Sequence, residues 1–205
     1  MAVDKNIHET RVRKHFLPLL DQHGVSSLAV GYRHSGNHIA RYRILAGIGD
    51  FSQASLLDVG CGIGHFAGWL NANGHRGAYT GVDLMPEMVD KATALYPGRT
   101  FAAADILSDD FPHSADYVIA SGIFHMGDAK LMKKMIAAMF EVCNIGVAFN
   151  SLSSWYDTTE QGEFYCADPL EILEYCRTLT PNILFRHDYL PHDFTVFIYK
   201  DDQIR

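Results

Sequence analysis

The sequence predicts an α/β protein with a doubly wound, mostly parallel sheet, and three observations support this fold class. From about residue 55 onward, short apolar strands alternate with helical patterns, which is typical of parallel strands joined by crossover helices. The first strand runs directly into a turn with three alternating glycines, Gly60, Gly62 and Gly64. The last two strand-like runs are joined by a link too short for a crossover, so we expect them to be antiparallel.

The individual elements follow from apolar periodicity and from turn residues. Strands are expected at residues 55–59, 79–84, 100–104, 116–121, about 145–150, 183–187 and 194–199. Helices are expected at residues 64–73, from Pro86 to before Pro97, at 129–142, and from Asp168 onward. Gly74 is the expected left-handed stop of the first of these helices. Asp168 and Glu171 fit a capping box at the start of the last one.

The N-terminal residues differ from this alternating pattern. Apolar spacing predicts one short helix that is interrupted or started near Pro18, and a second helix from Ser35 to about Ala46. This segment is too small to bury a core of its own. We therefore expect residues 1–50 to form a helical cap over the sheet edge, and residues 51–205 to form the main domain.

Composition excludes several classes of protein. Hydrophobic residues make up 48% and charged residues 20% of the 205 residues, which is ordinary for a soluble globular protein. The formal charge of −7 disfavours a large nucleic acid as partner, because wrapping a phosphate backbone usually needs a basic face. No signal peptide, membrane span or C-x-x-C pair is present. We expect a cytoplasmic protein with reduced cysteines and no membrane partner, and the oligomeric state stays open, with a homodimer as one option.

Acidic residues follow the glycine turn at the ends of successive strands. Glycines let a ligand approach the backbone closely, because no side chain stands in the way. Asp83 follows the second strand, where a carboxylate can accept from both hydroxyls of a ribose. Asp105 follows the third strand, where a carboxylate can accept from an exocyclic adenine amine. The ends of parallel strands converge on one crevice, so these features should line a single nucleoside ligand.

With these motifs the chain resembles the class I S-adenosylmethionine-dependent methyltransferases. The resemblance is carried by D-x-G-x-G-x-G at Asp58 to Gly64, by Asp83, by Asp105 and by the closing pair of strands, and it covers about residues 50–200. It implies a seven-stranded sheet whose last strand is antiparallel, S-adenosyl-L-methionine as cofactor, and methyl transfer as the reaction.

The resemblance also implies roles for single residues. The loop from Gly60 to Gly64 would meet the methionine portion of the cofactor, Asp83 the ribose, and Asp105 with Ile106 the adenine. Arg41 would either pair with the methionine carboxylate or face solvent as a helical arginine. The expected cofactor-binding residues are Arg41, Asp58, Gly60, Cys61, Gly62, Gly64, Asp83, Leu84, Met88, Asp105, Ile106, Ser121 and Gly122, with Leu84 and Met88 equally explained as plain core.

Two other functions compete with this interpretation. Gly62 to Ala67 also matches the G-x-G-x-x-A of NAD-dependent oxidoreductases, which likewise want an acid near position 83. Asp58, the second acid at Asp105 and the closing antiparallel pair argue against that family. A protein that binds S-adenosylmethionine without catalysis would keep the loop and lack a usable acceptor pocket.

The acceptor should lie at the carboxyl ends of the later strands, beneath the cap. The fourth strand ends in Ser121-Gly122-Ile123-Phe124 and lacks the Asp/Asn-Pro-Pro-aromatic signature of enzymes that methylate nucleic-acid bases, so an O- or N-nucleophile on a small molecule is favoured. His125 is the first candidate for a general base, with a surface or capping histidine as the alternative. His187 is the second candidate, in a polar loop that could equally be a hydrogen-bonded hairpin.

The remaining acceptor candidates come from the cap, from strand ends and from an aromatic loop that includes Trp155. The expected substrate-binding residues are Tyr32, Phe124, Asn150, Tyr156, Asp188, Tyr189 and His192. No spacing of histidines and carboxylates matches a metal-site signature, so no metal is expected.

Overall fold

The computed structural model describes residues 5–31, 36–156 and 164–200. Its helices and short 3-10 turns are α1 (Lys5–His23), η1 (Ser27–Val30), α2 (Asn37–Leu45), η2 (Ala46–Ile48), α3 (His65–Ala72), α4 (Pro86–Leu95), η3 (Phe124–Met126), α5 (Ala129–Val142) and α6 (Pro169–Leu179). Its strands are β1 (Leu56–Val59), β2 (Tyr79–Asp83), β3 (Thr100–Ala103), β4 (Ala115–Ala120), β5 (Cys143–Leu152), β6 (Ile183–Arg186) and β7 (Asp193–Tyr199).

The strands form one seven-stranded sheet in the order β3-β2-β1-β4-β5-β7-β6. Neighbouring strands from β3 to β5 are parallel, and β7 is antiparallel to both β5 and β6. The predicted doubly wound sheet with an antiparallel last strand is therefore confirmed. The order reverses beside β1, so the carboxyl ends of β1 and β4 flank the crevice where ligands bind in such sheets.

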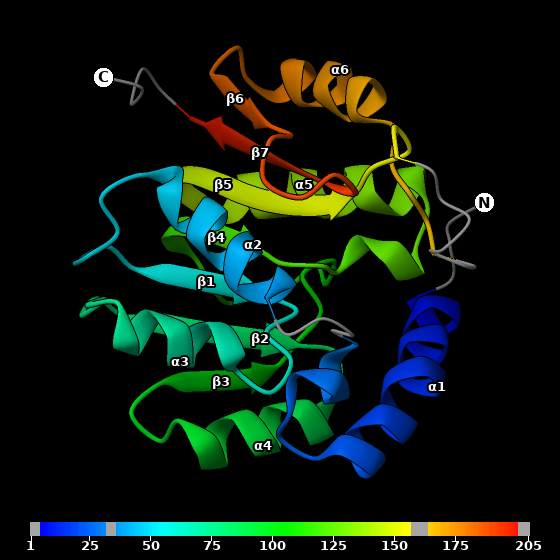
Figure 1. Ribbon diagram of the computed structural model, residues 1–205. Coiled ribbons are helices and arrows are strands. Elements are labelled where there is room, and N and C mark those ends of the chain that lie inside the picture. The colour runs from blue at the N-terminus through cyan, green and yellow to red at the C-terminus, as the bar shows by residue number, and fades with distance from the viewer. Residues whose placement is uncertain (1–4, 32–35, 157–163, 201–205) are drawn as a thin grey trace.

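Helices cover both faces of this sheet (Figure 1). On one face, Tyr42 of α2 and Phe66 and Leu70 of α3 are buried against sheet residues such as Leu56 and Ile119. On the other face, the apolar stripe of α5 and the buried side of α6 pack against the sheet. The amphipathic spacing predicted for helix 129–142 is thus confirmed, with bounds that match the prediction.

The N-terminal segment is more helical than predicted. α1 runs without a break through Pro18, although proline removes one helix hydrogen bond. Packing offsets that loss, because Leu20 is buried and Phe16 packs beside it in a cluster with Ile63 and Met85. α1 therefore lies close to the carboxyl end of the sheet, whereas α2 lies on a face rather than over the edge. The division at residue 50 stays a prediction.

Three further details differ from the sequence prediction or refine it. β5 is longer than residues 145–150, because β7 pairs with it along residues 146–152. Gly74 has a φ of 86° and follows α3 as expected. Asp168 caps α6 by accepting from the Leu170 amide at 3.0 Å, but the Glu171 carboxylate accepts from Lys133 Nζ at 2.8 Å.

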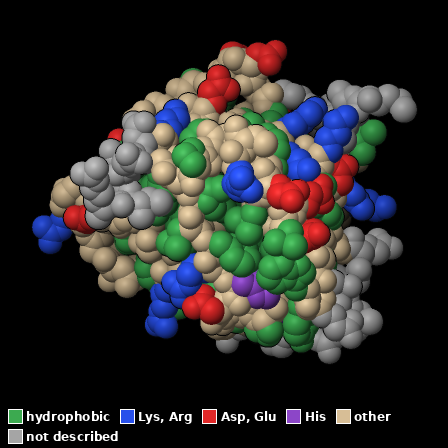
Figure 2. All heavy atoms as spheres, turned by 90° about the horizontal axis from the view of Figure 1, so that it is seen from above, with side chains coloured by type: hydrophobic (Ala, Val, Ile, Leu, Met, Phe, Trp, Pro, Cys, Tyr) green, Lys and Arg blue, Asp and Glu red, His purple; other side chains and the backbone are tan. Residues whose placement is uncertain are grey.

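Helix α6 and the edge strand β6 lie at the top of Figure 1, and the view from above shows a face of mixed character (Figure 2). Hydrophobic side chains gather there between acidic and basic ones. Leu170 of α6 and Leu184 of β6 are exposed.

No helix among the described residues is long and apolar enough to span a bilayer.

Candidate active site

A cavity of about 1660 Å³ opens at the carboxyl ends of β1 to β5, beside α1 and α2. Most of the residues expected to bind cofactor or substrate line it. These are Arg41, Asp58, Gly60, Cys61, Gly62, Asp83, Leu84, Asp105, Ile106, Ser121, Gly122, Phe124, His125, Asn150, Tyr156 and His192. The structure thus brings residues from the N-terminal segment and from the carboxyl ends of five strands to one place.

The glycine turn after β1 is held against β2. The amides of Gly60 and Cys61 both donate to the Val82 carbonyl, at 2.8 and 3.0 Å. Gly60 and Gly62 have φ values of 74° and 53°, a region that side-chain-bearing residues rarely adopt. A Cβ added at Gly60 would overlap the Ile123 side chain. These positions therefore need glycine, and the backbone itself faces the cavity.

Gly64 has a different role from the one expected of it. It is the N-cap of α3, with a φ of 81°, and it does not line the cavity. A Cβ at this position would meet the rings of Tyr96 and Phe101, at 2.9 and 3.1 Å. Gly64 therefore allows α3 to pack closely against its neighbours, and the structure gives it no ligand-facing surface.

Asp83 ties the glycine turn to the start of α4. Its Oδ2 accepts from the Gly62 amide at 2.9 Å, and its Oδ1 accepts from the Met85 amide at 2.9 Å. Burial raises the pKa of the Asp83 carboxyl, while the backbone donors lower it in part. The carboxylate lines the cavity at the end of β2, which is where a ribose acceptor was expected.

Asp58 is a buried acid beneath the same turn. The Tyr79 hydroxyl donates to its Oδ2 at 2.6 Å. Burial raises the pKa of Asp58 to about 7, even though the Tyr79 hydrogen bond opposes the shift. Burial and the nearby carboxylates of Asp83 and Asp58 also raise the pKa of the Cys61 thiol well above its usual value, so this thiol is not activated.

The residues expected around the adenine fall into two groups. Asp105 and Ile106 line the cavity, and Asp105 Oδ1 accepts from the Leu107 amide at 2.9 Å. Leu84 also lines the cavity. Met88 does not, because it is buried with Ile63 and Met85 under α1, which agrees with the alternative that it is plain core.

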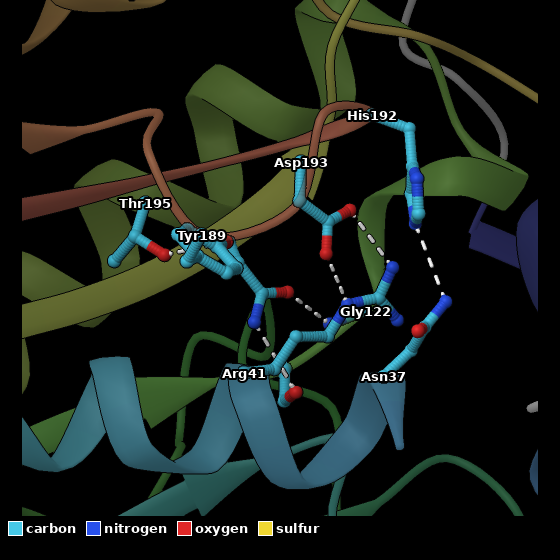
Figure 3. A network of polar contacts seen from close by, with 9 residues as sticks. Asn37, Arg41, Gly122, Tyr189, His192, Asp193 and Thr195 are labelled. Carbon is cyan, nitrogen blue, oxygen red and sulfur yellow. Dashed lines mark hydrogen bonds and ion pairs between the residues drawn. The ribbon is translucent and has the colours of Figure 1, made fainter. Parts of the chain in front are cut away.

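The carboxyl end of β4 is fixed by a buried amide from β5 (Figure 3). Asn150 Oδ1 accepts from the Gly122 amide at 2.8 Å, and its Nδ2 donates to Ser121 Oγ at 3.4 Å. Gly122 has a φ of 70°. The turn that leads to His125 is therefore positioned by the neighbouring strand.

Arg41 reaches across the cavity edge to β7 (Figure 3). Its Nε donates to Asp193 Oδ2, and a terminal nitrogen donates to Asp193 Oδ1 at 2.8 Å. Asp193 is fully buried. Nearby, Asn37 Nδ2 lies 3.5 Å from His192 Nε2. The His192 ring packs edge-to-face on the Tyr156 ring, with 5.9 Å between the ring centroids. Arg41 is therefore not a solvent-facing arginine, because its guanidinium group binds Asp193.

His125 follows Phe124 in η3 and lines the cavity. Burial, together with the positive charge of Arg41, lowers the pKa of His125 to about 4. The expectation that this imidazole titrates near neutral pH is therefore wrong. The side chain is a neutral imidazole at physiological pH.

Three of the predicted residues lie in the hairpin between β6 and β7 and do not line the cavity. His187 Nε2 lies 2.8 Å from Ser153 Oγ, and Tyr189 Oη lies 2.8 Å from Thr195 Oγ1. Asp188 forms an exposed ion pair with Arg186 at 2.6 Å. This arrangement matches the alternative of a hydrogen-bonded hairpin that was kept beside the catalytic one. His187 does not line the cavity, where a catalytic base would have to lie. Tyr32 lies outside the described residues.

The contribution of α1 to the cavity wall was not predicted from the sequence. His8, Arg11, His15 and Phe16 line it from this helix. His8, Arg11 and His15 are spaced by three, four and seven residues, which places them on one helix face, and Phe16 follows His8 by eight residues. This spacing was present in the sequence, but no role was predicted for His8, Arg11 or His15. Within the described residues, no group of three or more His, Cys, Asp or Glu side chains is arranged to hold a metal ion.

The sheet order, the glycine turn and the acids at successive strand ends define a nucleoside-binding α/β enzyme of the methyltransferase type. The chain matches the methyltransferase domain family over residues 56–146. It is 35% identical over 156 residues to "Putative methyltransferase Rv1506c" of Mycobacterium tuberculosis, and this match covers 71% of the chain and 93% of that protein. The chain therefore belongs to the class I S-adenosylmethionine-dependent methyltransferases, and it is a methyltransferase enzyme that uses S-adenosylmethionine.

Solved structures of methyltransferases share the fold. Magnesium protoporphyrin IX methyltransferase from Synechocystis, solved with bound S-adenosylmethionine, superposes with a TM-score of 0.70 at 15% identity, covering 98% of this chain and 99% of that one. N-methyltransferase NodS from Bradyrhizobium japonicum, solved with S-adenosylhomocysteine, superposes with a TM-score of 0.68 at 16% identity, covering 90% and 97%. At these identities the likeness extends to the fold alone.

Proposed function

We propose that this enzyme transfers the methyl group of S-adenosylmethionine to an O- or N-nucleophile on a small metabolite. One observation carries the proposal: a single cavity of about 1660 Å³ contains both the glycine turn with Asp83 and the side chains around His125. Pockets for one small ligand usually measure about 300–1,000 Å³. The cavity is therefore large enough for the donor and a small acceptor side by side.

The chain's own residues fit the donor. Asp83 is proposed to accept from the ribose hydroxyls, and Asp105 with Ile106 to meet the adenine, since all three line the cavity at strand ends. The backbone at Gly60 and Gly62 faces the cavity with no side chain in the way. When bound, the donor supplies an electrophilic methyl group on a sulfonium. The protein then has to hold the nucleophile in line with that methyl and exclude water.

For two residues the geometry favours roles that differ from the expected ones. Arg41 already makes two hydrogen bonds to Asp193, so we assign it to fixing α2 against β7 in place of binding the methionine carboxylate. His125, with a pKa of about 4, is neutral at pH 7 and can accept a proton only weakly. Positioning of the acceptor is therefore proposed to contribute more to catalysis than general-base chemistry.

The proposal also concerns where the enzyme acts and on what. The net charge of −7 favours a small acceptor over a nucleic acid. We propose a cytoplasmic location, in keeping with the thiol form of the buried Cys61, Cys143 and Cys176.

The test is calorimetric titration of the purified protein with S-adenosylmethionine, S-adenosylhomocysteine and NAD. We expect micromolar binding of the two adenosyl compounds and none of NAD, followed by transfer of a radiolabelled methyl group to a small-molecule fraction. Asp83→Ala should weaken cofactor binding by about 2–3 kcal/mol, because it removes charge-assisted hydrogen bonds. Asp90→Ala, on the exposed side of α4, is the matched control and should bind normally. Transfer only to protein or nucleic acid would contradict the proposal.

A further inference from the structure

Four rings at one end of the cavity pack against one another in a closed cycle. His15 and Phe16 come from α1, His125 from η3, and Phe164 from the segment before α6. The centroid distances are 4.7 Å for His15–Phe16 and 5.9 Å for Phe16–His125. They are 4.8 Å for His125–Phe164 and 5.5 Å for Phe164–His15, and all four contacts are edge-to-face. All four residues line the cavity, and we call them the four-ring cluster.

The charges around this cluster are cationic. Arg11 of α1 lines the cavity and donates to the carbonyl of Met126, one residue after His125, at 3.4 Å. The positive charge of Arg41 also lowers the pKa of His125. Asp193 balances Arg41, but it is fully buried and does not line the cavity, whereas Arg41 does. A negatively charged ligand is therefore favoured beside His125, and an ammonium group is disfavoured.

A buried hydroxyl at the end of β5 also indicates a ligand. Ser151 lines the same cavity and is 3% exposed. Its Oγ has no hydrogen-bond partner among the described residues. A buried hydroxyl without a partner is costly, so a ligand oxygen that pairs with it would gain binding energy.

We propose that the acceptor is a flat aromatic molecule that carries a carboxylate, which is already ionised at pH 7, with its ring packed on the four-ring cluster and its oxygen near Ser151. This inference rests on the proposed function and narrows its substrate class. Aromatic rings pack edge-to-face or offset on other rings, which the cluster offers and an aliphatic acceptor would not use.

The reaction balances without a base. The oxygen anion forms the new O–CH3 bond as the S–CH3 bond of the donor breaks, and the electron pair of that bond stays on sulfur. A positive sulfonium and a negative oxygen become two neutral products, and no proton moves. A neutral His125 at the site is compatible with this chemistry, because nothing has to be deprotonated.

The test measures binding to enzyme saturated with S-adenosylhomocysteine, so that no turnover occurs. The probes are benzoate, 4-hydroxybenzoate and 1-naphthoate, with benzylamine, tyramine, 1-naphthylmethylamine and cyclohexanecarboxylate as matched compounds. We expect each aromatic acid to bind saturably, and about tenfold more tightly than its amine or the saturated acid. Equal binding of amines or of cyclohexanecarboxylate overturns the inference, and so does failure of every aromatic acid to bind.

Variants separate this inference from the proposed function. Phe164→Leu and Ser151→Ala should each weaken binding of the aromatic acids about three- to tenfold while S-adenosylhomocysteine binding is unchanged. Trp155→Leu is the matched control, because this exposed ring does not line the cavity. If both variants bind the acids as the wild type does, the inference fails while small-molecule transfer still stands. If the adenosyl compounds themselves do not bind, the proposed function fails first.

Discussion

Arg41 and Asp193 form a two-point ion pair that fastens helix α2 to the first residue of β7. The two residues are 152 positions apart in the sequence, and their side chains are 11% and 0% exposed. The pair closes one side of the cavity, because Arg41 lines it and Asp193 lies behind. It therefore couples the placement of the N-terminal segment to the part of the sheet beside the cavity.

Breaking this pair should destabilise the fold strongly. Arg41→Ala would leave the Asp193 carboxylate buried without its partner, which typically costs about 3–5 kcal/mol of unfolding free energy. The double variant Arg41→Met with Asp193→Leu should lose less, because no uncompensated charge remains. Urea denaturation checks both. Arg186→Ala, at the exposed Arg186–Asp188 pair, is the control and should cost under about 1 kcal/mol. Equal losses for Arg41→Ala and Arg186→Ala would contradict the structural role.

The glycine turn provides a second prediction. Gly60→Ala would place a Cβ at a φ of 74° and into the Ile123 side chain. We expect a loss of about 1–2 kcal/mol from the backbone alone, with more from the overlap, and weakened cofactor binding. The matched control is Gly98→Ala, where nothing lies within 4 Å of the added Cβ. Thermal unfolding and calorimetry with S-adenosylhomocysteine measure the two effects. A Gly60→Ala variant as stable as Gly98→Ala would show that the turn can adapt.

The sheet was predictable from sequence because its signals are local. The strand runs, the glycine turn and Pro86 each report on a few neighbouring residues, and the acids at strand ends follow from the parallel topology. The continuous α1 through Pro18 was not predictable in this way. Its stability comes from packing on Ile63 and Met85, contacts that join distant parts of the chain.

Site residues that directly follow a strand could be predicted from the sequence. Residues whose role depends on a bond to a distant side chain could not. Asp83 and Asn150 lie at the cavity as expected. The partner of Arg41 could not be predicted, because Asp193 lies at the other end of the chain and its burial is set by the fold. His187 lies in a dense polar loop whose side chains bond to Ser153, just after β5, and to Thr195 of β7. Composition alone cannot distinguish such a hairpin from a binding loop.

Asp58 should make stability depend on pH. Its pKa is raised from 3.8 to about 7 by burial, so folding disfavours the ionised form. The wild type should be most stable with respect to this group below about pH 4, and should lose that stability as the pH rises to 7. The shift corresponds to at most about 4 kcal/mol. Asp58→Asn keeps an acceptor for the Tyr79 hydroxyl but cannot ionise. The unfolding free energy of the variant should therefore rise relative to that of the wild type between pH 4 and pH 7. A constant difference across this range would remove the assignment.

His125 should act in the opposite direction over the same pH range. Burial and the positive charge of Arg41 lower its pKa from 6.5 to about 4, so the native state resists protonation that the unfolded chain accepts. The contribution of His125 to the free energy of unfolding is fully present above pH 6.5. It is lost as the pH falls to 4, and the loss is at most about 3 kcal/mol. His125→Gln cannot be protonated, so urea midpoints measured between pH 4 and 7 should fall less steeply toward acid than those of the wild type. If His125 also serves as a base in turnover, kcat/KM of the wild type should decline toward acid near pH 4 and not near 6.5. A decline centred at 6.5, together with parallel stability curves for the two proteins, would show that the imidazole titrates as it does in water and that its surroundings do not exclude charge.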